Sequence, residues 1–562
     1  MRASASAPDL VQAARTWRDD DPDATTRAEL DGLIEQVERG SARSRLELAD
    51  RFSGMLQFGT AGLRGALGAG PNRMNRSVVI RAAAGLVAHL QAVGGPGAAP
   101  TVVIGYDARY SSDVFARDTA AVVEGMGGRA LLLPGPLPTP VLAFAIRHLR
   151  ADAGVMVTAS HNPPEDNGYK VYLGDGSQIV PPSDSEIAAR IAAVPSVAGV
   201  PRATEGWRTL DDSIVEDYIS AIVTVVAPDS PRELSCVHTS LHGVGHTTVA
   251  TAFVRAGFRP PTPVGEQALP DPDFPTVAFP NPEEPGAIDL ALELARSEPC
   301  DLVIANDPDA DRCAAAVLDP ALGDWRMLRG DEVGALLGAH LVNRGVEPGD
   351  VFASSIVSSR LLGAIAEAEG IRHDETLTGF KWISRVEGLR YGYEEALGYC
   401  VAPHLVRDKD GVSAALLLAE LAATLKSQGR GLTDLLDDLA VAHGVHATDS
   451  FSVPVSDLAQ SELLLRRLRE APVTSLAGRG VARVDDLSLG IGGLPPTEGL
   501  RYHLDDASRI IIRPSGTEPK VKIYLEVIEP VPDRDGLRAA QAVATGRLAA
   551  IRTELEQLTA LP

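Results

Sequence analysis

Short apolar runs that read as β-strands alternate with helical stretches through most of this chain, and this alternation restricts the fold more than any other feature. The first region predicts strands at Thr101–Tyr106, Ala130–Leu133 and Ala153–Val157, and helices at Ser111–Gly125 and Val141–Arg150. Strands separated by helices form β-α-β units, which build parallel or mixed sheets covered by helices. We therefore predict an α/β protein.

The same rhythm returns twice further along the chain. The second region predicts strands at Ser235–Thr239 and Asp301–Asn306 with helices at Thr247–Ala256 and Ala287–Ala295, and the third predicts a strand at Val351–Ser355, a helix at Arg360–Glu369 and a turn into Thr378–Lys381. In each region a polar loop follows the carboxyl end of a strand, where α/β sheets expose their ligand sites. Three similar α/β domains with mixed sheets are expected.

The two ends of the chain follow other patterns. From about Asp449 the order strand, helix and hairpin predicts a smaller C-terminal α+β domain, and Thr16–Phe52 predicts an amphipathic helical cover on the first domain. A chain of 562 residues is too long for one hydrophobic core, so about three to five domains are expected. We place the domains at residues 1–228, 229–330, 331–447 and 448–562, around a central active-site cleft.

The first polar loop carries a candidate nucleophile. It reads TASHNPPEDNGYK from Thr158 to Lys170, and its prolines, asparagines and glycine prevent a helix. Ser160 is therefore expected to lie exposed at the end of a strand, with His161 beside it as a candidate base. Lys170 supplies a cation for an anionic group. The alternative is a polar surface turn, which is the commoner explanation for an isolated Ser-His pair.

The second polar loop carries three alternating carboxylates, Asp307, Asp309 and Asp311, directly after an apolar run. Like charges this close require a cation, or else one carboxylate stays protonated. Oxygen ligands suit a hard ion, Mg2+ first and then Mn2+ or Ca2+. An EF-hand is disfavoured because Arg312 and Leu318 stand where that loop requires Gly and Glu. A phosphatase of the haloacid-dehalogenase type, with Asp307 as nucleophile, and a solvated acidic turn remain open.

The third polar loop, RPSGTEPK, is suited to phosphate and lies between two predicted strands. Arg513 offers a planar fork for two phosphate oxygens, and Ser515 and Thr517 offer hydroxyl donors. Gly516 lets backbone amides approach an anion closely. An ordinary hairpin could have this sequence, but Arg, Ser, Gly, Thr and Lys in one short loop favour phosphate capture.

Composition narrows the class of protein. The formal net charge of −23 argues against nucleic acid or an anionic membrane as a partner, so local Arg and Lys clusters must attract any phosphorylated ligand. The four cysteines form no CxxC pair and are predicted to be reduced thiols. The first residues lack the apolar stretch of a signal peptide, and the apolar run Val78–Leu90 is interrupted by Arg81 and is too short for a bilayer. A cytoplasmic enzyme is expected.

Further motifs accompany the three loops. They are FGTAGLRG at Phe58–Gly65, GPNRMN at Gly70–Asn75, LHGVG at Leu241–Gly245, FPNPEE at Phe279–Glu284, TGFKW at Thr378–Trp382 and YEEALGY at Tyr393–Tyr399. LHGVG hints at a dinucleotide site but lacks the last glycine of that fingerprint, so a structural turn is expected. In this order and at these separations, the motifs resemble the α-D-phosphohexomutase superfamily over nearly the whole chain, and more closely its phosphoglucomutase-2/phosphopentomutase-like branch.

The resemblance implies a mutase in which each of four domains contributes one loop. Family members move phosphate between C1 and C6 of a hexose, or between C1 and C5 of a pentose. By this likeness Ser160 is the phosphoserine, and Ser160, Asp307, Asp309 and Asp311 bind one Mg2+. The implied catalytic residues are Ser160, His161, Lys170, Arg64 and Arg312, and the implied substrate-binding residues are Thr60, Arg64, Thr378, Gly379, Lys381, Glu394, Glu395, Lys409, Arg513, Ser515, Gly516 and Thr517. Lys170 is the expected general acid/base, with a pKa lowered by nearby cations.

One departure bears on the substrate. Many hexose mutases carry Gly-Glu-x-Ser in the sugar loop, whereas this chain has YEEA, so the serine hydroxyl is missing at Ala396. We expect interconversion of glucose 1-phosphate and glucose 6-phosphate, with glucose 1,6-bisphosphate as intermediate and activator, in a monomer or homodimer. Pentose or mannose phosphates, glucose-1,6-bisphosphate synthesis, a metal-dependent sugar phosphatase and a non-catalytic sugar-phosphate sensor are the alternatives.

Overall fold

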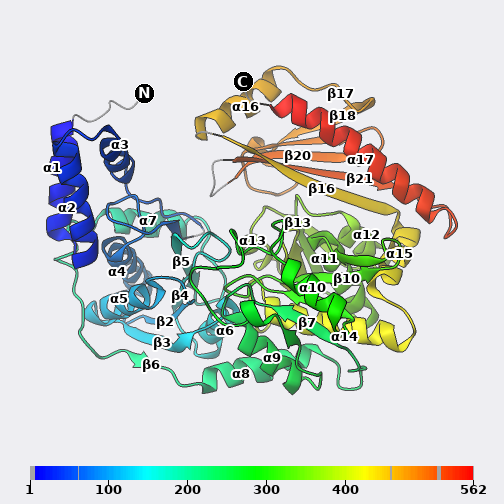
Figure 1. Ribbon diagram of the computed structural model, residues 1–562, viewed down its shortest axis with the longest axis horizontal. Helices are drawn as coiled ribbons and strands as arrows, with labels where there is room; N and C mark the ends of the chain where they lie inside the picture. The colour runs from blue at the N-terminus through cyan, green and yellow to red at the C-terminus, as the bar shows by residue number, and fades with distance from the viewer. Residues whose placement is uncertain (1–6, 61, 456–457, 516–519, 561–562) are drawn as a thin grey trace. The chain divides into compact units, whose positions relative to one another are not determined.

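The computed structural model describes residues 7–60, 62–455, 458–515 and 520–560. By its internal contacts the chain divides into two units, residues 1–318 with 398–420, and residues 319–397 with 421–562. Helices and strands alternate through most of the chain (Figure 1). Three of the sheets belong to α/β domains and the fourth to a separate C-terminal domain, so the predicted fold class is confirmed.

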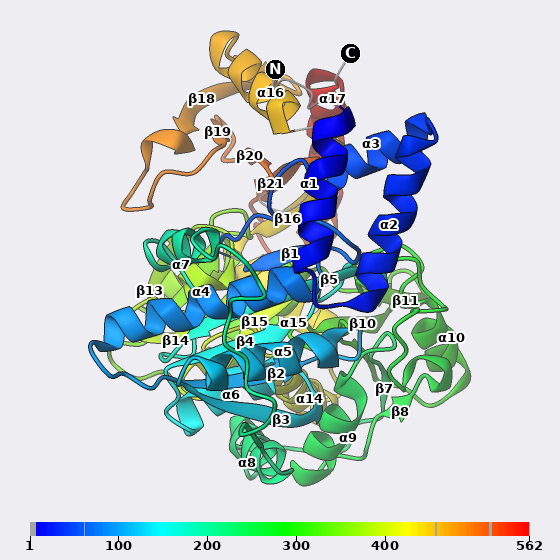
Figure 2. The ribbon, with the colours of Figure 1, turned by 90° about the vertical axis from the view of Figure 1, so that its left-hand side faces the viewer.

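Three helices precede the first sheet: α1 (Ala7–Asp20), α2 (Ala24–Glu38) and α3 (Ala42–Arg51). α1 and α2 lie side by side (Figure 2), and they share an apolar cluster with α3 that includes Leu30 of α2 and Leu48 of α3. The side chains of Asp23 and Ser41 accept backbone hydrogen bonds at the starts of α2 and α3, as helix N-caps do. The helical prediction for Thr16–Phe52 is confirmed, with two breaks and an earlier start.

The first sheet has the strand order β1-β5-β4-β2-β3-β6. Its strands are β1 (Leu63–Ala66), β2 (Thr101–Tyr106), β3 (Arg129–Pro136), β4 (Ala153–Val157), β5 (Asp166–Leu173) and β6 (Arg208–Thr209), and its helices are α4 (Arg76–Gly94), α5 (Ser112–Gly125), α6 (Thr139–His148), α7 (Ser183–Ala192) and α8 (Ser213–Ile222). β2 runs parallel to β3 and β4, whereas β5 runs antiparallel to β4 and β1. Because β5 returns along β4, Lys170 lies on a strand opposite Met156 and not in the predicted loop.

The helix α4 is strongly apolar. Within the described ranges it is the one helix long and apolar enough to cross a membrane, so the prediction that this run is too short is wrong on length. Inside the protein 67% of its apolar window is buried. The helix packs in the core of the first domain with Val102, Ile104 and Phe115. A mostly buried core helix passes the same length and composition test.

Four strands of a second sheet also lie in the first unit, in the order β10-β9-β7-β8. The elements of this region are β7 (Cys236–Thr239), β8 (Thr262–Pro263), β9 (Leu302–Ala305), β10 (Ala314–Asp319), α9 (Gly245–Arg255), α10 (Asp289–Ser297) and the short helices η1 (Val223–Val225) and η2 (Gly265–Gln267). β9 runs parallel to β7 and antiparallel to β10. The segment 398–420 adds β15 (Gly398–Cys400) and the first turns of α14 (Gly411–Ser427).

The second unit begins with a parallel sheet ordered β13-β12-β14. The elements of this part of the second unit are β11 (Asp324–Met327), β12 (Val351–Ser355), β13 (Arg372–Thr376), β14 (Leu389–Glu394), α11 (Gly330–Asn343), α12 (Leu361–Ala368), α13 (Phe380–Ile383) and α15 (Leu432–His443). The sequence did not predict β13, because its residues, RHDET, are mostly polar. A polar strand is tolerated at this position because β13 pairs on one side only within these three strands.

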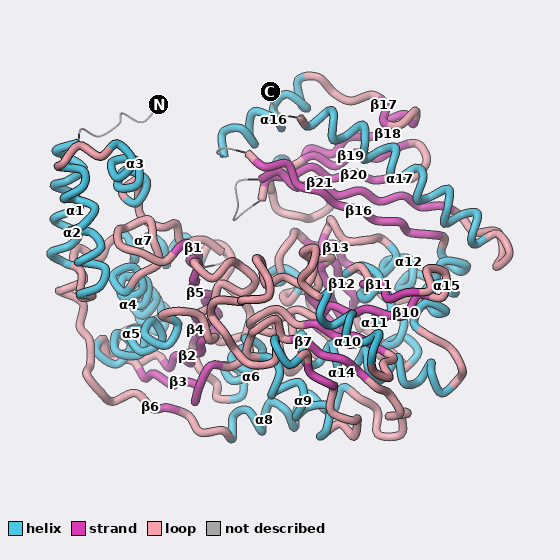
Figure 3. The backbone as a smooth tube through the Cα atoms, in the orientation of Figure 1, coloured by secondary structure: helices cyan, strands magenta, loops and turns pink. Residues whose placement is uncertain are grey.

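The last domain is an antiparallel sheet ordered β16-β21-β20-β19-β18-β17 with helices on one face (Figure 3). Its elements are β16 (Val445–Pro454), β17 (Ser475–Leu476), β18 (Arg479–Asp486), β19 (Leu500–Leu504), β20 (Arg509–Pro514), β21 (Lys520–Glu529), α16 (Leu458–Glu470), α17 (Leu537–Thr559) and η3 (Leu487–Leu489). Ile510 and Ile512 face these helices, whereas Ile511 joins a separate apolar cluster. Side chains alternate along a strand, so Arg513 projects from the same face as Ile511.

Candidate active site

Ser160 lies in the serine loop, residues 158–165, between β4 and β5 of the first unit. Its φ of 55° is left-handed, a conformation that costs a non-glycine residue about 1–2 kcal/mol. Two side chains hold its backbone: Thr158 Oγ1 accepts the Ser160 N–H at 2.8 Å, and Arg109 Nη2 donates to the Ser160 carbonyl at 2.6 Å. Ser160 is only 3% exposed, so the predicted exposure of this residue is wrong.

The hydroxyl of Ser160 faces the aspartate loop, residues 306–313, which connects β9 to β10. Oγ donates to Asp307 Oδ2 at 2.8 Å and lies 3.2 Å from Nδ1 of His161. Ser160 and Asp307 are 147 positions apart in the sequence. The first two predicted loops, which come from different sheets, therefore meet at one hydroxyl-carboxylate contact.

Asp307, Asp309 and Asp311 form one buried group. One oxygen of each lies within 4.8 Å of the others, and none of the three residues is more than 1% exposed. Thr139, at the start of α6, donates its backbone N–H (2.9 Å) to the carbonyl of Asp309 and its hydroxyl (2.6 Å) to Oδ2. These two hydrogen bonds from the first domain hold the aspartate loop in place, and so they help to keep the three carboxylates close together.

The LHGVG motif packs against the aspartate loop at Pro308. The N–H of Val244 donates to the carbonyl of Pro308 at 2.9 Å. A Cβ on Gly243 would lie only 2.2 Å from the Cα of Pro308, so only glycine permits this approach. The motif is the structural turn that the sequence predicted.

Two lysines neutralise part of the aspartate charge. Lys170 Nζ donates to Asp309 Oδ2 (2.7 Å) and Asp311 Oδ2 (2.8 Å), and Lys409 Nζ lies 3.3 Å from Asp311 Oδ2. Burial alone would lower the pKa of Lys170, but Asp309 and Asp311 outweigh burial and raise that pKa. This direction is opposite to our expectation, since the adjacent groups are carboxylates. Lys409, expected to bind the substrate, contacts Asp311 in the first unit.

The aspartates fit a divalent cation. Burial and then the charges of Asp309 and Asp311 raise the pKa of Asp307 well above its usual range. Despite burial, Lys170 holds the pKa of Asp309 low. Within the described ranges, the Oδ1 atoms of Asp309 and Asp311 have no hydrogen-bond partner. Buried charged oxygens without a partner are costly unless a cation binds them, and an all-oxygen set suits Mg2+.

Two arginines of the first unit, Arg64 and Arg312, contact the serine loop and the aspartate loop. Arg64 Nη1, on β1, donates to the Asn162 side chain at 3.0 Å, and Arg312 Nε lies 3.9 Å from Asp307 Oδ2. Burial and then Arg312 and Arg64 lower the pKa of His161 well below its usual value. His161 is therefore neutral at pH 7. Thr60 lies in the turn just before β1.

The second unit contains the predicted sugar and phosphate residues. Glu394 ends β14, and Oε2 of the following Glu395 accepts hydrogen bonds from Ser355 Oγ (3.0 Å) and Ser358 Oγ (3.2 Å). Thr378 and Gly379 precede α13, Lys381 lies on it, Arg513 lies near the end of β20 and Ser515 follows β20. The predictions for Gly516 and Thr517 fall outside the described residues.

Tyr524 joins the sugar and phosphate elements of the second unit. It packs with Val357, Leu377 and Ile511 in one buried cluster. Burial and then Glu395 raise the pKa of Tyr524, and Arg513 hydrogen-bonds to the phenol. Sequence reasoning missed Tyr524. The signal available was its place in the alternating run KVKIYLEV.

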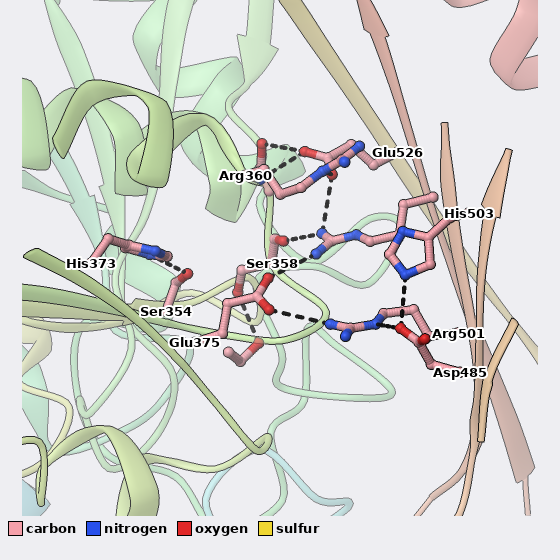
Figure 4. A network of polar contacts seen from close by, with 12 residues as sticks. Ser354, Ser358, Arg360, His373, Glu375, Asp485, Arg501, His503 and Glu526 are labelled. Atoms are coloured by element: carbon pink, nitrogen blue, oxygen red, sulfur yellow. Dashed lines mark hydrogen bonds and ion pairs between the residues drawn. The ribbon is translucent and has the colours of Figure 1, made fainter. Parts of the chain in front are cut away.

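The second unit also contains an ion-pair network (Figure 4). Glu375, on β13, pairs with Arg501 and Arg509 of the last sheet at 3.2 Å each. Glu526, on β21, pairs with Arg509 (3.1 Å) and with Arg360 (2.6 Å). The network connects the β12-β13-β14 sheet region to the C-terminal sheet, and no short motif marks its members.

Four family models match the chain in order. They describe alpha/beta/alpha domains I, II and III and the C-terminal domain of phosphoglucomutase/phosphomannomutase, and they match residues 55–197, 216–320, 329–442 and 456–531. Together these matches cover most of the sequence.

Individual proteins agree with the family models. A "Probable phosphomannomutase" of Haemophilus influenzae is 46% identical over 458 residues, which cover 81% of this chain and 93% of the relative. The phosphopentomutase of Homo sapiens is 35% identical over 560 residues, covering 89% and 90%. The crystal structure of a phosphoglucomutase/phosphomannomutase family protein from Burkholderia thailandensis superposes with a TM-score of 0.69 at 20% identity, covering 89% of this chain and 97% of that chain, and shows the same fold.

Proposed function

Since the chain belongs to the phosphoglucomutase/phosphomannomutase family and is a phosphomutase, we propose that it moves a phosphoryl group between C1 and the terminal carbon of an aldose phosphate through phosphorylated Ser160. The observation that carries this proposal is the 2.8 Å hydrogen bond from Ser160 Oγ to Asp307 Oδ2, inside the buried carboxylate group. A hydroxyl held against a cation site is suited to accept and return a phosphoryl group.

Asp307, Asp309 and Asp311 are the proposed ligands of Mg2+, together with an oxygen of Ser160. When bound, Mg2+ would neutralise charge on the phosphoryl group and on the serine oxygen. The transition state of phosphoryl transfer is loose and carries charge on its equatorial oxygens. Arg64 and Arg312, with neutral His161, are proposed to stabilise that charge.

Proton transfer to the sugar is assigned to Lys170. Its raised pKa keeps the ammonium protonated at neutral pH, which suits a donor to the departing sugar oxygen. In the reverse half-reaction the same nitrogen would accept that proton. The contact of Lys409 with Asp311 supports charge neutralisation at the aspartates in place of the sugar contact first expected.

The second unit is proposed to bind the sugar and the phosphate that is not transferred. Glu394 and Glu395 would accept hydrogen bonds from sugar hydroxyls, with Thr378, Gly379 and Lys381 as further contacts from this unit. Thr60, in the first unit, is proposed as one more substrate contact. Arg513 and Ser515, with Gly516 and Thr517, would bind the distal phosphate. The hydrogen bond between Arg513 and Tyr524 supports this assignment, because Tyr524 packs in the same cluster as Leu377, the residue just before Thr378.

Glucose 1-phosphate and glucose 6-phosphate are the proposed substrates, with glucose 1,6-bisphosphate as intermediate. Mannose and pentose phosphates are supported at least as well, by the names of the two relatives. The alanine at position 396 removes one potential sugar contact and favours tolerance over strict selection. The substrate is settled by comparing kcat/KM for glucose, mannose and ribose 1-phosphates, each with its own bisphosphate present.

Intact-protein mass spectrometry tests the phosphoserine. After incubation with Mg2+ and glucose 1,6-bisphosphate, the wild-type chain is expected to gain one phosphoryl group and Ser160→Ala none. Ser185→Ala, an exposed serine of the same domain, is the matched control and should keep the adduct. An adduct that persists in Ser160→Ala and disappears in Asp307→Asn would instead favour the phosphatase alternative.

A further inference from the structure

Arg109 contacts the serine loop through an extensive set of backbone hydrogen bonds. Its Nη2 donates to the carbonyls of Ser160 (2.6 Å) and Asn162 (2.6 Å), and its Nη1 donates to those of Pro163 (2.7 Å) and Asp166 (3.3 Å). The residue is 4% exposed. One planar guanidinium therefore donates to four carbonyls in and next to the turn, a geometry that a lysine ammonium cannot reproduce.

Asp107 completes the support from the same strand end. It follows β2 directly, and its Oδ2 lies 3.3 Å from Arg109 Nε. The same Oδ2 accepts the hydroxyl of Thr158 at 2.6 Å, and Thr158 Oγ1 accepts the Ser160 N–H. Both backbone polar groups of Ser160 are thus tied through side chains to residues just after β2.

Arg109 is itself fixed by the second domain. Its guanidinium carbon lies 4.9 Å from the ring centroid of Phe274, within the range of a cation–π contact. The neighbouring Tyr110 donates its hydroxyl to Asp273 Oδ1 at 2.8 Å. The support behind Ser160 therefore rests on both the first and the second domain, which also supply the two halves of the Ser160-Asp307 contact.

The conformation of Ser160 explains why such support is needed. A non-glycine residue at a φ of 55° persists only where its surroundings hold it. Without Arg109, the carbonyls of Ser160 and Asn162 would lose this donor, and the turn would relax to satisfy them. Relaxation would turn Oγ away from Asp307.

Resting on the proposed function, we propose that Arg109 is a positioning residue for phosphoryl transfer, because it holds the Ser160 backbone so that Oγ faces the aspartates in both half-reactions. Arg109 acts through the serine loop and requires no contact with the sugar. Its loss should therefore lower kcat and leave KM nearly unchanged.

The test compares Arg109→Lys with the wild-type enzyme. A misplacement of about 1 Å costs roughly 100-fold in rate, so kcat should fall about 100-fold, with KM within about threefold. Lysine keeps the positive charge of Arg109. If Arg109→Lys has the kcat of the wild type, the role of Arg109 is electrostatic and the proposal is overturned. Arg76→Lys is the matched control: it removes a bidentate pair with Asp118 (2.7 and 2.8 Å) elsewhere in the first domain, and should keep kcat.

A second variant tests the proposal independently, in case Arg109→Lys does not fold. Thr158→Val removes only the hydroxyl between Asp107 and the Ser160 N–H, and kcat should fall about tenfold at constant KM. Unchanged kcat in either variant, or a rise in KM that accounts for the loss, contradicts the proposal. The proposed function fails separately, if the wild-type chain neither gains a phosphoryl group on Ser160 nor interconverts sugar phosphates.

Discussion

Asp307 is the carboxylate of the aspartate group whose ionised form is most disfavoured. Burial and then Asp309 and Asp311 raise its pKa, so its charge opposes folding until a cation neutralises it. Asp307→Asn should therefore raise the free energy of unfolding by about 1 kcal/mol in a chelating buffer. The same change should remove most of the stabilisation that Mg2+ gives the wild-type chain.

Urea unfolding with a chelator and with Mg2+ measures both effects. Asp113→Asn, which changes a partly exposed aspartate on α5, is the control and should respond to Mg2+ as the wild type does. Equal stabilisation of wild type and Asp307→Asn by Mg2+ would show that Asp307 is not a ligand.

At the residue scale, sequence reasoning located side chains that follow strands and missed those that act through backbone groups. Ser160 and the aspartates follow strand ends, and a strand end is a position that periodicity reveals. Arg109 reaches the carbonyl of Ser160 across 51 positions. Nothing in a local pattern shows that a guanidinium will meet carbonyls so far away. The pKa direction of Lys170 was wrong for the same reason, since its strand pairing was not predicted.

At the scale of elements, Glu526 on β21 is held by two arginines and a histidine from other parts of the second unit. Burial alone would raise its pKa, but Arg509, His446 and Arg360 outweigh burial and hold that pKa well below its usual value. Removing one partner of a buried ion pair leaves the others uncompensated. Glu526→Gln should lower the free energy of unfolding by about 3–5 kcal/mol at pH 7.

The pH dependence gives this prediction a second readout. A carboxylate with a depressed folded-state pKa stabilises the fold above its unfolded pKa of about 4.5, and this contribution is lost as the pH falls through the folded pKa. The difference between wild type and Glu526→Gln should therefore shrink below about pH 4.5. Glu498→Gln, whose side chain is 57% exposed beside Arg469, is the control and should cost at most about 1 kcal/mol. A loss that is independent of pH would contradict the assigned ion pairs.

Strands were predicted with the right bounds where the run of apolar residues in the sequence is also buried in the structure. β2 and β12 have the predicted bounds, because their apolar residues are buried on both faces of a sheet. β13 was missed because its charged residues lie at the edge of the three strands of its unit, where Glu375 joins the network with Arg501 and Arg509. The division of the chain into two units could not be predicted from the sequence either. Residues 398–420 group with the first unit through contacts such as that between Lys409 and Asp311.

At the scale of the whole molecule, a net charge of −23 repels a phosphorylated substrate, whereas the arginines and lysines near Ser160 attract it locally. The two effects differ in range. The Debye length is about 30 Å at 0.01 M salt and about 8 Å at 0.15 M, so added salt screens the distant acidic surface before the nearby cations. With Mg2+ constant, kcat/KM for a sugar 1-phosphate should rise roughly two- to threefold between 0.01 and 0.15 M NaCl and then fall at higher salt. A decrease from the lowest salt onward would mean that the local cations dominate at every distance and that the acidic surface does not impede substrate approach.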